Sequence, residues 1–180
     1  VIAAAATLLG GMAFGTAGAY AAGSASIEVR HSQKGHTYSA YKFASLTVDG
    51  DAVQVDTDAD WVTAVTDAVA AANNNMDPVV SMPSEYDGNP AAFAATKTGD
   101  NDAAWFRTFA ASLAVGDGVV ADKTVTGNGG TAAIGALDEG WYLITDVDGE
   151  GGRGTNAIVA TTLNGVAATF KVKGDPATGQ

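Results

Sequence analysis

Cysteine is absent from this sequence and positive charge is scarce, with nine lysine and arginine residues against twenty aspartate and glutamate residues. The absence of cysteine excludes disulfide bonds, so any covalent reinforcement of the fold would need other chemistry. The formal net charge of -11 gives a surface that repels phosphate backbones and anionic lipids. The composition therefore argues against a nucleic-acid-binding protein and against a peripheral membrane protein.

Catalytic and cofactor-binding motifs are also missing from the sequence. It has no G-x-S-x-G elbow, no cysteine nucleophile and no glycine-rich phosphate loop. Its two histidines, His31 and His36, have no third residue at a spacing typical of metal ligands. We therefore expect that the protein is not an enzyme, and we expect no cofactor and no metal site.

The first charged residue is Glu28, and the segment before it is apolar and rich in alanine and glycine. Residues 19–21 form an A-x-A pattern, which is typical of a signal-peptide cleavage site. Internal glycines and the lack of a basic flank disfavour the alternative, a transmembrane anchor. We predict that residues 1–21 are a cleavable signal peptide, truncated at its start because the sequence begins at Val1 without a basic segment.

After this leader, hydrophobic residues recur with a period of two, then of about 3.6, then of two again. The helical period falls between about residues 58 and 117, where Asp58 or Asp60 could cap a helix through Asn73 and a second helix begins at Asp102. Residues 76–102 between them are predicted to be irregular. The predicted strands are 27–29, 36–48, 52–55, 119–125, 131–134, 141–147, 157–163 and 166–173. This order predicts a mainly β protein, a β-sandwich with a two-helix insertion.

Two features resemble binding sites but are better explained by structure. Trp61, Trp105 and Trp141 could stack on sugars, yet they lie in apolar stripes and are predicted to be core residues. The acidic run that includes Asp56 and Asp58 resembles a calcium loop, but Trp61 stands where the sharp turn needs glycine. A helix cap is the better explanation of those aspartates.

Residues 35–43, 140–146 and 169–176 resemble three parts of one known domain. The first, G-H-T-Y-S-A-Y-K-F, is similar to the second strand of the N-terminal domain of Gram-positive, sortase-assembled major (backbone or shaft) pilins. The second, G-W-Y-L-I-T-D, is similar to a late strand of that domain, and the third to the stretch that carries the family's linkage lysine. The resemblance implies an Ig-like, CnaB-related sandwich at residues 22–174, followed by a linker at 175–180 to a missing downstream domain.

In that family a sortase joins the C-terminal threonine of one subunit to a lysine of its neighbour, and the resemblance places this lysine at Lys173. Strand alternation predicts that Lys171 and Lys173 point outward, as an amine that attacks an acyl-enzyme must. The family usually has proline directly before the lysine, where this sequence has Val172, so Lys171 is the alternative. Both lysines could also be solvated edge charges that discourage strand aggregation.

Related domains often contain an internal Lys–Asn isopeptide bond promoted by a buried carboxylate. By resemblance, Asp146 aligns with the acidic position, and Lys42 with Asn164 is a conceivable bonded pair. The first strand, however, carries Arg30 where the attacking lysine is expected, and arginine does not supply a usable amine. We therefore expect that the crosslink is missing and that Asp146 is an ordinary acid at a strand end.

The resemblance implies a structural subunit of a covalently polymerised cell-surface pilus, secreted and anchored at the cell wall. Its expected partners are neighbouring pilin subunits, a pilin-specific sortase and host surface ligands, with no nucleic acid and no membrane after signal cleavage. The alternative is a non-polymerising, cell-wall-anchored adhesin domain that presents a binding face, such as the 76–102 segment. No L-P-x-T-G sorting signal occurs up to Gln180, so we expect that the gene continues downstream.

Overall fold

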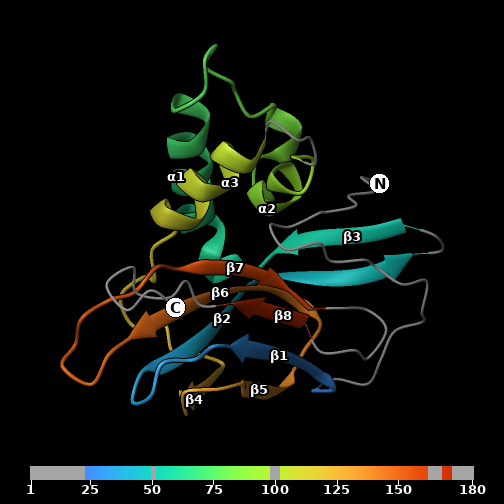
Figure 1. The fold of residues 1–180 in the computed structure, drawn as a ribbon. Coiled ribbons are helices and arrows are strands. Elements are labelled where there is room, and N and C mark those ends of the chain that lie inside the picture. Colours follow the sequence, from blue (N-terminus) through green and yellow to red (C-terminus); the bar gives the residue numbers. More distant parts are fainter. Residues whose placement is uncertain (1–22, 50–51, 98–101, 162–167, 172–180) are drawn as a thin grey trace.

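The computed structural model describes residues 23–49, 52–97, 102–161 and 168–171, and the structural statements below refer to those residues (Figure 1). The predicted signal peptide at 1–21 and the predicted linker at 175–180 lie outside the described residues. Within the described ranges, no helix is both long and apolar enough to cross a membrane.

The chain forms strands, then helices, then strands again, in the order that the change of hydrophobic period predicts. The strands are β1 (Ala25–Arg30), β2 (Thr37–Asp49), β3 (Ala52–Thr57), β4 (Lys123–Thr126), β5 (Ala132–Leu137), β6 (Gly140–Val147), β7 (Ala157–Ala160) and β8 (Ala168–Lys171). The helices are α1 (Val62–Asn74), α2 (Pro90–Ala94) and α3 (Ala103–Ser112), with 3-10 turns η1 (Ala59–Trp61) and η2 (Ser84–Tyr86).

The strands form two sheets. A three-stranded sheet has the order β5-β1-β8, and a five-stranded sheet has the order β3-β2-β6-β7 with β4 also paired to β2. β1 and β8 run parallel, and the other pairs are antiparallel. β6 follows one flank of β2, while β4 and β3 share the other flank, β4 opposite residues 37–40 and β3 opposite residues 44–49. A gap in the pairing therefore remains along β2 between β4 and β3.

The five-stranded sheet is a middle layer, with the three-stranded sheet on one face and the helices on the other (Figure 1). β6 shows this arrangement best, because Tyr142 and Ile144 lie in the core between the sheets, and Trp141 and Leu143 lie in the core under the helices. Side chains alternate between the two faces of a strand, so a strand covered on both faces has a continuous apolar sequence. The fold is mainly β with two packed sheets, in agreement with the coarse prediction.

The helices are held together by an aromatic core. Trp105 and Phe109 of α3 stack with ring centroids 5.2 Å apart, and both are fully buried. Asn73 of α1 is also buried, and its Oδ1 accepts a hydrogen bond from Trp105 Nε1 at 2.8 Å. The first helix was expected to end at Asn73, but it runs to Asn74 and Asn75 is its C-cap. Asn73 instead forms a buried polar link between α1 and α3.

The prediction of an irregular 76–102 segment is wrong in part, because it contains η2 and α2. All five residues of α2 are buried, and Pro90 occupies its first turn, where a missing backbone N–H costs nothing. The run Ala91-Ala92-Phe93-Ala94 is too short to show a helical period, and the nearby prolines and glycines read as turns. The helical layer therefore has three α-helices in the described residues, where two were predicted.

The strand predicted at 119–125 is also shorter than expected, since β4 begins at Lys123. Residues 113–122 instead form an irregular return segment that leads from α3 back to the sheet, and Gly118 has a positive φ of 81° within it. The segment meets the sheet where Asp122 N donates a hydrogen bond to Ala40 O at 2.8 Å. This return segment borders both cavities described below.

Candidate functional site

The linkage lysines were predicted at the end of the chain, and the structure describes only part of that region. β8 is an edge strand of the three-stranded sheet and ends at Lys171. Its parallel register pairs Lys171 with Arg30 of β1. Lys173 and Asn164 lie outside the described residues. The structure therefore places the backbone of Lys171 at the end of an edge strand, and the role of Lys173 stays a prediction.

The two described members of the conceivable intradomain crosslink are not brought together. Lys42 of β2 pairs with Tyr142 of β6, whereas Asp146 pairs with Tyr38, four residues further along the same strands. At about 3.3 Å per residue, that offset separates the two backbones by about 13 Å. Lys42 Nζ instead lies 3.7 Å from Asp58 Oδ2. An acid at Asp146 is thus in no position to promote attack by Lys42.

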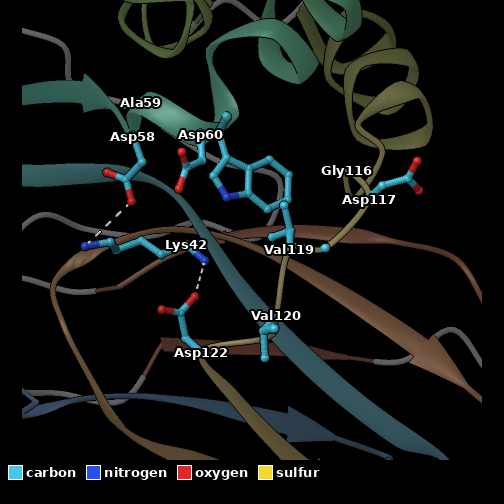
Figure 2. Close-up of a pocket in the computed structure, with 11 residues that line it drawn as sticks. Lys42, Asp58, Ala59, Asp60, Gly116, Asp117, Val119, Val120 and Asp122 are labelled. Atoms are coloured by element: carbon cyan, nitrogen blue, oxygen red, sulfur yellow. Dashed lines mark hydrogen bonds and ion pairs between the residues drawn. The ribbon is translucent and has the colours of Figure 1, made fainter.

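Lys42 lies in a cleft at the gap in β2 pairing (Figure 2). We call this the Lys42 cleft, and its volume is about 600 Å³. It is lined by Lys42, Asp58, Ala59, Asp60, Trp61, Gly116, Asp117, Gly118, Val119, Val120 and Asp122. Four aspartates and one lysine give its walls an acidic character, and Val120 at the rim is 84% exposed.

Two of these aspartates complete the sheet where β2 has no neighbouring strand. Asp122 Oδ2 accepts a hydrogen bond from Lys42 N at 2.7 Å, and Asp58 N donates one to Phe43 O at 3.0 Å. Asp58 Oδ1 also accepts a bond from Ser45 Oγ at 3.0 Å. Asp58, one of the two predicted cap residues, is the N-cap residue of η1, but its carboxylate makes no capping hydrogen bond there. Unpaired backbone groups on a buried strand are costly, which explains why polar groups fill the gap.

The Lys42 cleft is lined mainly by charged and apolar side chains. The Lys42–Asp58 pair is partly exposed, with 21% and 29% of the two side chains accessible, so it contributes little to stability. In the described part of the chain, no group of three or more histidine, cysteine, aspartate or glutamate residues is arranged to hold a metal ion. The contacts show a structural use for two of its acids, Asp58 and Asp122.

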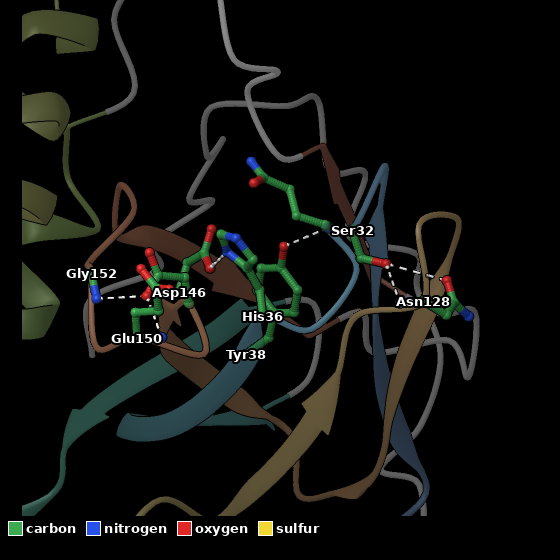
Figure 3. A network of polar contacts seen from close by, with 9 residues as sticks. Ser32, His36, Tyr38, Asn128, Asp146, Glu150 and Gly152 are labelled. Atoms are coloured by element: carbon green, nitrogen blue, oxygen red, sulfur yellow. Dashed lines mark hydrogen bonds and ion pairs between the residues drawn. The ribbon is translucent and has the colours of Figure 1, made fainter. Parts of the chain in front are cut away.

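A polar network that the sequence did not indicate lies at the start of β2 (Figure 3). His36 Nδ1 and Asp146 Oδ1 are 2.7 Å apart, and the Asp146 side chain is only 8% exposed. The expectation that Asp146 is an ordinary strand-end acid is therefore wrong, because it is a buried acid with a histidine partner. The β2–β6 register pairs Asp146 with Tyr38, two residues after His36, so His36 and Asp146 are diagonal neighbours across the two strands.

The network continues from His36 into the loop that follows β1. The His36 ring stacks on Tyr38 with centroids 6.4 Å apart, and the Tyr38 hydroxyl accepts a hydrogen bond from Gln33 N at 2.8 Å. Burial raises the pKa of Tyr38, while the bond from Gln33 opposes that shift. The Ser32 hydroxyl donates to Gly130 O at 2.8 Å, and Ser32 Oγ lies 3.3 Å from Asn128 Oδ1, which joins this loop to the turn before β5 (Figure 3). These contacts join the loop after β1, the turn before β5 and the end of β6 at one end of the sandwich.

The β6–β7 turn beside this network is ordered by Asp148. Its Oδ1 accepts hydrogen bonds from Gly152 N at 2.7 Å and from Glu150 N at 2.9 Å. These backbone donors hold the pKa of Asp148 below its usual value. The Asp148 carboxylate thus accepts hydrogen bonds from within the turn. Glu150 beside it is exposed.

Comparison with known proteins adds no identification. No protein-family model matches the chain, and no curated protein matches its sequence. The functional argument therefore rests on the residues and geometry described above.

Proposed function

We propose that this chain is a structural domain of a covalently polymerised cell-surface pilus, joined to its neighbour by a sortase through a lysine near the end of β8. The proposal rests on the pilin-like segments of the sequence. It includes the proposal that the sandwich is Ig-like and CnaB-related. A mainly β fold of two packed sheets, with helices on a single inter-strand connection, suits a subunit that carries load along a fibre.

The position of β8 is the observation that supports the proposal most directly. β8 follows β1 in parallel, and the order β5-β1-β8 leaves one of its flanks without a hydrogen-bonded strand in the described part of the chain. The backbone of a lysine at the end of such a strand is paired with β1 on one flank and has no paired strand on the other within the described residues. The proposal requires that this lysine amine be accessible to a bulky acyl-enzyme.

The reaction follows from the proposed role. A neutral lysine Nζ attacks the carbonyl carbon of the threonyl acyl-enzyme, and the C–N bond of an amide forms as the bond to the enzyme breaks. The amine loses a proton, and the enzyme nucleophile leaves in its free form. The reaction consumes no oxidant or reductant, so the pilin needs to supply only the amine and its placement.

The test is polymerisation of the complete gene product in the presence of its sortase. We expect Lys173→Ala to abolish the high-molecular-weight ladder while changing the free energy of unfolding by no more than about 0.5 kcal/mol. Lys123→Ala is the matched control, because Lys123 is an exposed lysine on strand β4. A ladder lost only in Lys171→Ala would move the acceptor by two residues. A ladder that persists in both variants would refute the linkage on this strand and favour a non-polymerising adhesin.

A further inference from the structure

A second cavity, which we call the Arg153 pocket, has a volume of about 280 Å³. It lies on the helix-facing side of the middle sheet, where the segment after α3 approaches β2, β6 and the loop after β6. It is lined by Tyr41, Ala111, Leu113, Ala114, Val115, Thr145, Asp146, Val147, Arg153 and Asn156. Neither the resemblance to pilins nor the polymerisation proposal uses these residues together.

The lining combines an apolar floor with a few polar groups. Leu113 is 1% exposed and belongs to the core under the helices, and Val115 packs against the same core. Tyr41 is held by an edge contact to Trp61, with ring centroids 6.2 Å apart. Thr145 and Asn156 add a hydroxyl and an amide. The exposed lining is about equally polar and apolar, so the pocket offers both a packing surface and placed polar groups, as small-molecule sites do.

Arg153 is the group at this pocket that can attract an anion. Its lining has one basic residue, Arg153, and one acidic residue, Asp146. Asp146 is already engaged, with its Oδ1 2.7 Å from His36 Nδ1. In the described part of the chain, the Arg153 guanidinium has neither an ion pair nor a hydrogen bond. Arg153 is thus an exposed cation at the pocket, although acidic residues outnumber basic ones in the chain by twenty to nine.

The backbone that carries Arg153 is fixed before any ligand binds. Arg153 forms a β-bridge with Val147, and Gly154 N donates a hydrogen bond to Asp146 O at 2.8 Å. Asp148 N donates to Gly152 O at 2.8 Å just before it. A guanidinium on a preordered backbone loses less entropy on binding, and its planar fork matches a carboxylate in two parallel hydrogen bonds.

We propose that the Arg153 pocket binds a small molecule with one carboxylate and a compact body, with the carboxylate on Arg153 and the body against Val115 and Tyr41. The volume of about 280 Å³ is at the lower limit for ligand sites, which selects a molecule the size of a single sugar acid or a small aromatic acid. The net negative charge of the chain does not prevent this, because screening over about 8 Å at physiological salt lets the local cation dominate.

The test compares each acid with a neutral counterpart of similar shape. Benzoate and benzamide form one pair, and glucuronate and glucose form another, each titrated into the chain of the printed sequence and followed by amide NMR. We expect at least one acid to give saturable shifts at residues 113–115 and 153–156, with no saturable shifts from its neutral counterpart. Neither acid binding better than its counterpart, or shifts confined to other residues, would overturn the proposal.

Two arginine variants distinguish a specific contact of Arg153 with the acid from a general effect of positive charge. Arg153→Gln should weaken binding of the acid about tenfold or more, since a charge-assisted contact is lost. Arg107→Gln, which removes an exposed arginine of α3 that does not line the pocket, should change it by less than about twofold. Both variants should retain the circular dichroism spectrum of the parent. Equal losses in the two variants would show a nonspecific charge effect and refute the site.

Discussion

Asn89 is predicted to hold α2 against the open edge of the middle sheet, and its removal should measurably destabilise the fold. Its Oδ1 accepts hydrogen bonds from Thr57 N at 2.9 Å and from Thr57 Oγ1 at 2.8 Å, and its Nδ2 donates to Val55 O at 2.9 Å. The Thr57 hydroxyl also accepts a bond from Ala91 N at 2.9 Å. The side chain of Asn89 therefore satisfies backbone groups at the edge of β3, and the Thr57 hydroxyl accepts a hydrogen bond from the first turn of α2.

The expected cost of Asn89→Ala follows from these contacts. Asn89 Nδ2 also donates a long hydrogen bond to Asp56 Oδ1 at 3.4 Å, and the three shorter bonds, at about 1 kcal/mol each, together contribute about 3 kcal/mol. Asn89 is only half-buried, so water can reach some of the groups that lose their partner. The free energy of unfolding should therefore fall by about 2–3 kcal/mol, which is a large part of the 5–15 kcal/mol typical of a domain.

Urea unfolding followed by circular dichroism measures this loss. Asn75→Ala is the matched control, because Asn75 is exposed and its Nδ2 donates one hydrogen bond, to Thr108 Oγ1 at 3.0 Å. It should cost no more than about 0.5 kcal/mol. Thr57→Val combined with Asn89→Ala should cost less than the sum of the single changes, since the two residues share a bond. A loss for Asn89→Ala no larger than that of the control would refute this reasoning.

The elements that sequence reasoning predicts well are those with a regular burial pattern. The helix beginning after Asp102 was predicted from its apolar stripe, and Trp105, Phe106 and Phe109 of that stripe are buried. Trp61 and Trp141 are also core residues, as predicted. Burial against a layer repeats with the period of the strand or helix, so a single sequence carries that information.

The residues that sequence reasoning missed act through single side chains, which have no period. Asn89 and Asp122 bond to strand edges, and neither stands out from the many asparagines and aspartates of the chain. The His36–Asp146 pair needs the register of two strands about a hundred residues apart. The sequence did carry one indication of this pair. If the predicted strands at 36–48 and 141–147 are antiparallel neighbours, the start of the first lies beside the end of the second. The exact register, however, was needed to identify the partners.

Two further changes test the cores on either side of the middle sheet. Asn73→Ala should cost about 1–3 kcal/mol in urea unfolding, because it leaves the buried Trp105 Nε1 without its acceptor. Asn74→Ala, an exposed neighbour, is its control, and equal losses would contradict the buried link. In the other core, burial raises the pKa of Tyr142 above its ordinary value of 10.0, and its hydroxyl donates to Asp138 O at 2.9 Å. Above pH 10 the unfolded chain loses the Tyr142 proton while the folded chain keeps it, so the stability that Tyr142 contributes falls as pH rises. Tyr142→Phe lacks this titration and should be less stable than the parent at pH 8, by about 1 kcal/mol, with a difference that narrows towards pH 11. Urea midpoints measured across that range that keep a constant difference would show that the Tyr142 phenol titrates alike in both states.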